Sequence, residues 1–254
     1  MNRKNIQRAK VMTRICVSDS KYLENLMKKM HQVNVCLATR RIDRISALAT
    51  ELAAKHNIQA LAVETDVTNY ASCQRAVASA EEAFQSKLDI LVNNAGVMHY
   101  TYMKNNVVSE WQQTIDVNCT GMVNCLGAAL PSLLSHRNGH VIAISSDAGR
   151  VVFPGLSVYS GSKFFVEALA KGLRLECAES HGLKVTSIQP GDCKTELSLR
   201  DTDSEAKGEC AQTNMNREYW LDPEDVAQNI LFALTRPDHV AVQEIMVEPK
   251  HVPA

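Results

Sequence analysis

The chain has no glycine before Gly96, although it contains 11 glycines in 254 residues. Glycine is the residue that allows positive φ angles and close approach of the backbone to a ligand. The first third of the chain therefore lacks the residue type from which phosphate-binding turns are built. Any glycine-dependent turn must lie at Gly96 or beyond.

The chain also lacks an excess of charge and long apolar runs. Its net charge is −1 and its pI is about 6.7, so there is no basic footprint for nucleic acid or an anionic membrane. No apolar stretch approaches the roughly 20 residues that a membrane helix requires. The start, "MNRKNIQRAKVMTR", is basic but has no apolar segment typical of a secretory signal. We predict a cytoplasmic protein, with a mitochondrial presequence as the alternative.

The eight cysteines are scattered and form no CxxC pair, and neither cysteine nor histidine shows metal-ligand spacing. In a chain of this size the pattern favours reduced thiols in a reducing compartment over a disulfide framework. We expect no metal site.

Short β-branched runs alternate along the chain with longer segments of helical period. This alternation predicts a three-layer α/β fold, a doubly wound parallel sheet (Rossmann fold), in a single domain over 1–254. The expected strands are 33–38, 60–63, 88–92, 140–145, 184–189 and 244–248. The expected helices lie near 42–56, 68–86, 107–135, 157–179 and 222–235, the last beginning with Asp222 as a cap and Pro223 in the first turn.

Three expected strands are followed directly by polar or glycine-bearing segments. These are "NNAG" (93–96), "SSDAG" (145–149) and "PGDCKT" (190–195). Ligands of open α/β sheets bind beyond the carboxyl ends of the strands. We therefore expect these three segments to border the functional site.

Tyr159 and Lys163 stand four positions apart at the start of an expected helix, so both side chains lie on one face. Alone, this spacing is equally typical of ordinary helix surface. Two further polar residues are candidates for the same site. Ser146 lies at the end of an expected strand, and Asn118 lies in the middle of an expected helix. Whether the pair is ordinary helix surface or a proton-transfer device depends on these neighbours.

The chain, from about residue 33 onward, resembles the short-chain dehydrogenase/reductase family. The matching segments, in the family's order, are "DVT" (66–68), "LVNNAG" (91–96), "DVN" (116–118), "ISS" (144–146), "YSGSK" (159–163) and "PG" (190–191). The resemblance implies hydride transfer between a nicotinamide cofactor and a carbonyl or alcohol. Within the family the chain looks most like broad-specificity NADP-dependent 3-hydroxy acid and serine-type dehydrogenases.

The resemblance assigns a role to each of the four residues. Tyr159 would be the general acid or base, and Lys163 would lower the pKa of its phenol with help from the positive nicotinamide ring. Ser146 would bind the substrate oxygen, and Asn118 would hold a water that links Lys163 to solvent.

Arg40 and Arg41 occupy the place where the family discriminates between dinucleotides, and no carboxylate follows until Asp43. A guanidinium suits the 2′-phosphate of NADP(H), which we expect as the cofactor. The alternative is a pair of surface arginines at the start of a helix. The resemblance also places these residues along the cofactor, together with Tyr159 and Lys163: Asp66, Val67, Asn93, Ala95, Gly96, Pro190, Gly191, Cys193 and Thr195.

The first 32 residues or so depart from the family. Its glycine-rich turn, TGxxxGxG, should fall at about 14–21, where the chain has "RICVSDSK". Left-handed geometry costs a residue with a side chain roughly 1–2 kcal/mol. Arg14 is also unusual in a strand covered on both faces. The helix expected after Ser18, Asp19 or Ser20 keeps a polar cap and one apolar face. Native divergence, an alternative first exon and a gene-model error are the explanations left open.

These departures leave two hypotheses of different classes. The first is an NADP(H)-dependent oxidoreductase acting on a small carbonyl compound or secondary alcohol, with residues 192–219 as its substrate loop. The second is a catalytically impaired protein, or a variant product, that keeps the fold for a binding or structural role. By resemblance we expect a homodimer or homotetramer, formed by helix faces within 107–135 and 157–179.

Overall fold

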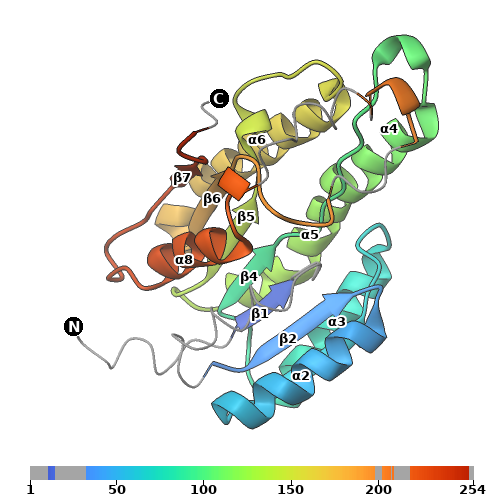
Figure 1. Cartoon of the computed structure of the whole chain (residues 1–254). Coiled ribbons are helices and arrows are strands. Elements are labelled where there is room, and N and C mark those ends of the chain that lie inside the picture. The colour runs from blue at the N-terminus through green and yellow to red at the C-terminus, as the bar shows by residue number, and fades with distance from the viewer. Residues whose placement is uncertain (1–10, 15–32, 198–201, 207, 209–217, 252–254) are drawn as a thin grey trace.

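The computed structural model describes residues 11–14, 33–197, 202–206, 208 and 218–251 (Figure 1). Within these residues, seven strands form one parallel sheet in the order β3-β2-β1-β4-β5-β6-β7. They are β1 (Val11–Arg14), β2 (Val35–Thr39), β3 (Ala60–Glu64), β4 (Ile90–Asn93), β5 (His140–Ile144), β6 (Lys184–Pro190) and β7 (Glu244–Val247). The strand order reverses between β1 and β4, which is where doubly wound sheets bind ligands.

Helices cover both faces of the sheet. The α-helices are α2 (Ile42–His56), α3 (Tyr70–Phe84), α4 (Val108–Ile115), α5 (Gly121–Leu133), α6 (Ser157–His181) and α8 (Pro223–Leu234). Shorter elements are the 3₁₀ turns η1 (Met103–Asn105) and η3 (Asp147–Gly149) and the π-helical turn η2 (Asp116–Thr120). In the part of the chain that the structure describes, no helix is long and apolar enough to cross a bilayer.

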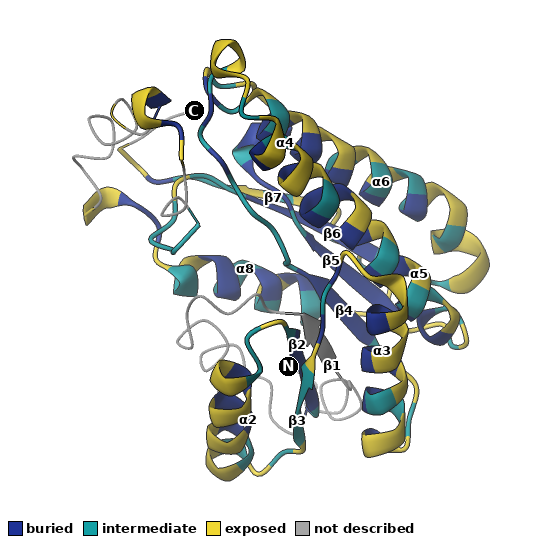
Figure 2. Cartoon of the chain, turned by 90° about the vertical axis from the view of Figure 1, so that its right-hand side faces the viewer, coloured by how far each residue is buried: buried dark blue, intermediate teal, exposed yellow. Residues whose placement is uncertain are grey.

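The alternation of strand side chains builds two cores, one on each face of the sheet. Val35 and Leu37 of β2 pack with α2 and α8, whereas Cys36 between them faces the opposite core with α3, α5 and α6. Because both faces are covered, the strands β2, β4, β5 and β6 are buried almost throughout, as Figure 2 shows for the middle of the sheet, whereas β3 and β7 are partly exposed. The buried sheet holds the strand ends, and hence the site, in fixed positions.

The predicted fold class is confirmed, and each strand and helix expected from residue 33 onward has its counterpart. The expected helix over 107–135 is divided into α4 and α5 by the π-helical turn at 116–120. Val11–Arg14 pairs in parallel with both β2 and β4, so this segment is an interior strand of the sheet. The segment 14–21, where the family has its glycine-rich turn, lies outside the described residues except for Arg14. The helix expected after Ser18 also lies outside them.

Candidate active site

Ser146 lies just after β5, where the backbone is extended before it turns into η3. Its side chain is buried, and its Oγ donates a hydrogen bond to Asp147 Oδ1 at 2.6 Å. The same Oγ accepts a bond from the backbone N–H of Ala148 at 3.2 Å. The carboxylate of Asp147 therefore orients the Ser146 hydroxyl, which we expect to bind the substrate oxygen.

Tyr159 and Lys163 lie on the first turns of α6, and both are buried. Lys163 Nζ is 5.5 Å from the centroid of the Tyr159 ring. It donates a hydrogen bond to the carbonyl oxygen of Ile144, the last residue of β5, at 3.0 Å. The pair thus faces the end of β5, next to Ser146.

Asn118 is 2 % exposed and lies in the π-helical turn. Its Nδ2 donates to Val97 O and to Ser162 Oγ, both at 2.9 Å, and its Oδ1 accepts from Val97 N at 2.8 Å. A Cβ added to Gly96 would lie 3.5 Å from Asn118 Oδ1 and 3.8 Å from Lys163 Nζ. The loop after β4 therefore runs directly past the lysine, and a π-turn places the amide there, as such turns often do at functional sites.

The pKa values of the two ionisable groups are set mainly by burial. Burial raises the pKa of the Tyr159 phenol above its ordinary value; the hydrogen bond with Ser146 lowers it, and the charge of Asp147 raises it. The groups of the chain alone therefore raise the pKa of the phenol, and its lowering by Lys163 together with a bound nicotinamide ring stays a prediction. Burial also lowers the pKa of Lys163 to about 8, opposed by the negative charge of Glu167 and then by Cys119.

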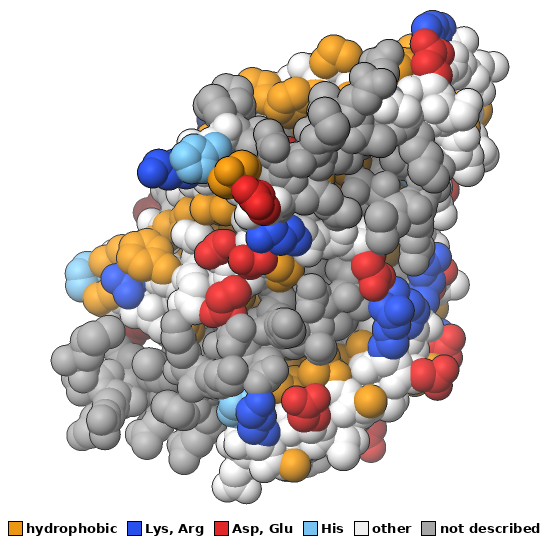
Figure 3. All heavy atoms as spheres, viewed as in Figure 1, with side chains coloured by type: hydrophobic (Ala, Val, Ile, Leu, Met, Phe, Trp, Pro, Cys, Tyr) orange, Lys and Arg blue, Asp and Glu red, His pale blue; other side chains and the backbone are white. Residues whose placement is uncertain are grey.

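Arg40 and Arg41 differ in their surroundings. Arg40 is exposed, whereas Arg41 Nη1 lies 3.1 Å from Glu196 Oε2. Arg44 Nη1 lies 3.3 Å from the other oxygen of that carboxylate. Figure 3 shows basic side chains gathered with an acidic one over the start of α2. A residue of the expected substrate loop thus contacts the arginine that we expect to bind the 2′-phosphate.

The segment expected to contact adenine follows β3. Asp66 Oδ1 accepts hydrogen bonds from the backbone N–H and the hydroxyl of Thr68, both at 2.9 Å. Val67 is buried against α5, and its carbonyl accepts a bond from Asn124 Nδ2 at 2.9 Å. The turn is therefore fixed from both sides at the carboxyl edge of the sheet.

Asn93, Ala95 and Gly96 lie at the end of β4. Asn93 is buried and its Nδ2 donates to Met122 O at 3.2 Å, so its side chain ties the strand to α5. Ala95 and Gly96 are half-buried in the loop that passes Lys163. Of these three residues, Gly96 is the one that lies next to the ammonium group of Lys163.

The expected carboxamide side lies at the end of β6. Pro190 is the last residue of the strand, and Gly191 N donates to Val247 O of β7 at 2.9 Å. Cys193 forms a parallel bridge with Leu221, and Thr195 N donates to Cys193 O at 2.8 Å. Together these contacts hold the first residues of the expected substrate loop at the carboxyl edge.

Three carboxylates near these segments were not predicted as site residues. Asp147 directly follows Ser146, and Asp192 directly follows Gly191. Their place in the segments "SSDAG" and "PGDCKT" could therefore have identified them as residues near the site. Glu248 follows β7, and no motif marks it. Its side chain occupies the space over Gly191 that a Cβ there would need.

The described residues fit a dinucleotide along this edge. Arg41, the Asp66 turn, Gly96 and the residues around Thr195 follow the ends of β2, β3, β4 and β6 in the order that such a ligand needs. The space beside Gly96 is kept free of a side chain. Contacts with the diphosphate would come from 14–21, of which the structure describes Arg14 alone, as a strand residue.

The family model for short chain dehydrogenases matches residues 22–206. The chain belongs to the short chain dehydrogenase family. Glycine betaine reductase of Emericella nidulans is 46% identical over 223 residues, which cover 87% of this chain but 17% of that protein. This chain therefore spans only a small part of the length of that relative.

Two further comparisons cover nearly whole proteins. An uncharacterized oxidoreductase of Staphylococcus saprophyticus is 33% identical over 214 residues, or 84% of each chain. A closed form of serine dehydrogenase complexed with NADP+ has a TM-score of 0.80 and 27% identity, covering 93% of this chain and 94% of that one. These matches therefore cover most of the chain and most of each of the two proteins.

Proposed function

We propose that the chain is an NADP(H)-dependent oxidoreductase that interconverts a small carbonyl compound and its secondary alcohol. One observation carries the proposal. Ser146, Tyr159, Lys163 and Asn118 are all buried, and they converge at the carboxyl edge of a short chain dehydrogenase fold. The sequence arranges four polar side chains in one buried place, which is costly unless they serve a function.

In the proposed reaction the nicotinamide, when bound, supplies a hydride for reduction. Tyr159 donates its phenolic proton to the substrate oxygen as the carbonyl becomes an alcohol, and takes it back in oxidation. Lys163 stays charged beside the phenolate and stabilises it. Ser146 turns its hydroxyl from Asp147 to the substrate oxygen, where negative charge develops. Asn118 keeps the 96–97 backbone against the lysine.

Two observations support NADP(H) over NAD(H). Arg40 and Arg41 follow β2 and no carboxylate stands at the position that would bind a free ribose hydroxyl. The pair between Arg41 and Glu196 is partly exposed, and such surface pairs contribute only about 0–1 kcal/mol. A phosphate can therefore replace the carboxylate at little cost.

The test is titration of the full chain with NADPH while cofactor fluorescence is followed, with NADH in parallel. We expect micromolar binding of NADPH, weaker binding of NADH, and oxidation of NADPH by small ketones. Tyr159→Phe should keep the binding and lose the oxidation. Turnover by that variant at the wild-type rate would refute the role of the phenol.

A second candidate function is a silent member of the family that keeps the fold for partner binding. The absence of glycine at 14–21 favours it, because the family's phosphate turn depends on glycine. The same titration decides between the two. No binding at millimolar NADPH would exclude the enzyme for this chain and leave the silent protein.

The relative named for glycine betaine supports a small polar substrate. Glycine betaine carries a permanent positive charge. The charges around the reaction centre are therefore relevant to which substrate the chain binds.

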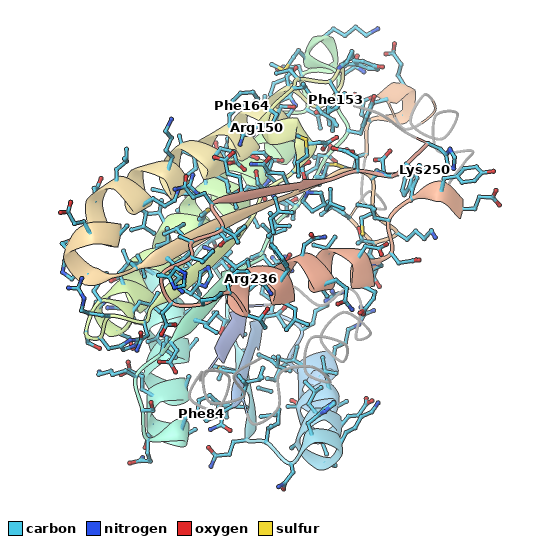
Figure 4. All side chains as sticks on the ribbon, turned by 90° about the vertical axis from the view of Figure 1, so that its left-hand side faces the viewer. Phe84, Arg150, Phe153, Phe164, Arg236 and Lys250 are labelled. Atoms are coloured by element: carbon cyan, nitrogen blue, oxygen red, sulfur yellow. The ribbon has the colours of Figure 1, made fainter. Side chains whose placement is uncertain are left out.

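We also propose a homodimer or homotetramer in the cytoplasm, formed through α5 and α6. A groove of about 470 Å³ between these helices is lined mostly by apolar residues. Phe164, Phe165 and Val123 are exposed nearby, and Figure 4 shows Phe164 on α6. Light scattering of wild type and Phe165→Glu would test the interface: a monomeric wild type refutes it.

A further inference from the structure

Two short segments that are far apart in the sequence are hydrogen-bonded to each other beside α4. One is the turn 202–206, called the loop turn below, which lies within the expected substrate loop. The other runs from Thr101 through η1 to Glu110 in α4. Figure 1 shows the loop turn, in orange, next to α4.

The first part of this contact is made by Glu110, which is 6 % exposed. Its Oε1 accepts hydrogen bonds from the backbone N–H of Thr202 at 3.0 Å and from the hydroxyl of Thr202 at 2.6 Å. A buried carboxylate is costly unless hydrogen-bond donors reach it. The loop turn therefore supplies two donors to a buried acidic side chain of α4.

The second part of the contact runs in the opposite direction, from donors near η1 to Asp203, which is 7 % exposed. Asp203 Oδ2 accepts from Tyr102 N at 3.0 Å and from Asn105 Nδ2 at 2.9 Å. Asp203 Oδ1 accepts from the backbone N–H groups of Glu205 and Ala206, both at 3.1 Å. One carboxylate thus caps its own turn and holds that turn against η1.

The charge state of Asp203 suits this role. Burial raises its pKa, but the hydrogen bonds from Asn105 and from three backbone N–H groups lower it more, so the pKa lies below its ordinary value. Asp203 is therefore ionised at neutral pH, and hydrogen bonds to an ionised acceptor are stronger than those between neutral groups. The ion pair between Lys104 and Glu205 is exposed by comparison, and such pairs contribute little.

The segment that receives the loop turn is itself bonded to the chain that leads into α6. Thr101 N donates to Gly155 O at 2.8 Å, and Trp111 Nε1 donates to Thr101 Oγ1 at 2.7 Å. Gly155 lies four residues before Tyr159, and a Cβ added to it would lie 2.5 Å from the ring of Tyr100. The loop turn is therefore held by a segment that packs next to the start of the helix that carries Tyr159.

We propose that Asp203 is a positioning residue for the reduction: it holds the loop turn against η1 and so keeps the substrate side of the reaction centre preorganised. The inference rests on the proposed function. A ligand that binds only the form with this contact made has its apparent affinity reduced by the fraction of molecules in which the contact is open. Weakening the contact should therefore raise KM for the carbonyl substrate. It should leave kcat unchanged at saturation, because bound substrate favours the form with the contact made.

The first experiment compares Asp203→Asn with the wild type in the reduction of butane-2,3-dione by NADPH. An amide has one oxygen, so either the donors near η1 or those of the turn lose their acceptor. We expect KM for the diketone to rise about tenfold, the effect of losing a hydrogen bond to a charged group, while kcat and NADPH affinity stay the same. Asn105→Ala should act in the same direction. The double variant should be little worse than Asp203→Asn alone, because both changes weaken one contact.

The matched control is Glu81→Gln, which removes a surface acid on α3 that pairs with Lys87 at 3.0 Å. It should leave KM and kcat unchanged. If Asp203→Asn does not fold, Thr202→Val replaces it. This variant loses the hydroxyl that donates to Glu110 but keeps the backbone donor, and it should raise KM by a smaller factor.

A second experiment, limited trypsin digestion of the cofactor-free protein, tests the contact without activity. Trypsin cleaves after Arg200 and Lys207, which flank Thr202 and Asp203 in the sequence. Well below the melting temperature of both proteins, cleavage at these two sites should be about tenfold faster in Asp203→Asn, because local opening controls the rate. Mass spectrometry of the fragments identifies the sites.

Equal cleavage rates, or a lower kcat with an unchanged KM, would overturn the role of Asp203 and leave the oxidoreductase intact. If butane-2,3-dione is not reduced, the digestion alone decides about the contact. Absence of NADPH binding together with faster cleavage of the variant would instead overturn the proposed function, and with it the positioning role.

Discussion

Lys163 donates its hydrogen bond to the carbonyl oxygen of Ile144, 3.0 Å away, and its ammonium lies 5.5 Å from the centroid of the Tyr159 ring. The cation is therefore anchored to the end of β5. The pKa of the phenol is governed by burial, by the bond with Ser146 and by the charge of Asp147. The chain alone keeps the phenol protonated, in the state that donates a proton during reduction.

We predict that Tyr159 ionises above the ordinary tyrosine pKa of about 10 in the cofactor-free protein. The measurement is the ultraviolet absorbance of tyrosinate during alkaline titration, as the difference between wild type and Tyr159→Phe. The stability contribution of this group is present below the unfolded pKa of about 10 and is lost as pH rises through the higher folded pKa. A difference signal near neutral pH would contradict the prediction.

A second prediction concerns Glu167, four residues after Lys163 on α6. Its carboxylate accepts hydrogen bonds from Ser187 Oγ at 2.5 Å and Gln189 Nε2 at 2.9 Å, and its charge raises the pKa of Lys163. Glu167→Gln should move the alkaline limb of kcat/KM to lower pH, because the ammonium then loses its proton more easily. Glu176→Gln, on the exposed end of the same helix, is the matched control. An unmoved limb would show that Glu167 is only structural.

The same shift has a consequence for stability. The pKa of Lys163 is lowered from 10.5 in the unfolded chain to about 8. Between these values the unfolded chain binds more protons, so the free energy of unfolding rises with pH there. Below pH 8 the buried ammonium destabilises the fold. Lys163→Met should remove this part of the pH dependence, which urea unfolding at several pH values would measure.

Much of the fold follows from local pattern. Val35, Cys36 and Leu37 form an apolar run typical of a strand covered on both faces, and Pro223 after Asp222 predicts the start of α8. The resemblance to the family predicted that Ser146, Tyr159 and Lys163 meet, and in the structure all three lie at the end of β5.

What the sequence left open depends on register and on burial. Glu248 becomes a site residue only through the pairing of β6 with β7, and Glu196 meets Arg41 only through a contact between distant segments. The pKa of Tyr159 could not be predicted from the motif, because the motif names the cation one turn away but not the burial that outweighs it. The lack of the family's glycines at 14–21 is known from the sequence, because the structure describes only Arg14 in this segment.

The contact between Glu196 and Arg41 leads to a fourth prediction. Glu196→Gln removes the carboxylate that competes with a 2′-phosphate for Arg41 and Arg44. NADPH should bind more tightly by up to about fivefold, the range expected for a surface ion pair. NADH binding should not change, since NADH has no such phosphate. Fluorescence titration of both cofactors measures the ratio, and weaker NADPH binding would mean that Glu196 orders the site.

The last prediction concerns Gly121, the first residue of α5. A Cβ there would lie 2.5 Å from Val67 Cγ2 and 3.1 Å from Val67 Cβ, so a side chain displaces the turn after β3. Gly121→Ala should lower the free energy of unfolding by about 1–3 kcal/mol, the usual cost of overpacking. It should also weaken NADPH binding if Val67 contacts the adenine.

The matched control for that change is Gly161→Ala on α6, where an added Cβ meets nothing within 4 Å. Alanine in a helix is favoured over glycine by about 0.5–1 kcal/mol, so this variant should be more stable than the wild type. Urea unfolding of both variants gives the two opposite shifts. Equal shifts in one direction would mean that helix propensity, and not the contact with Val67, decides the effect at Gly121.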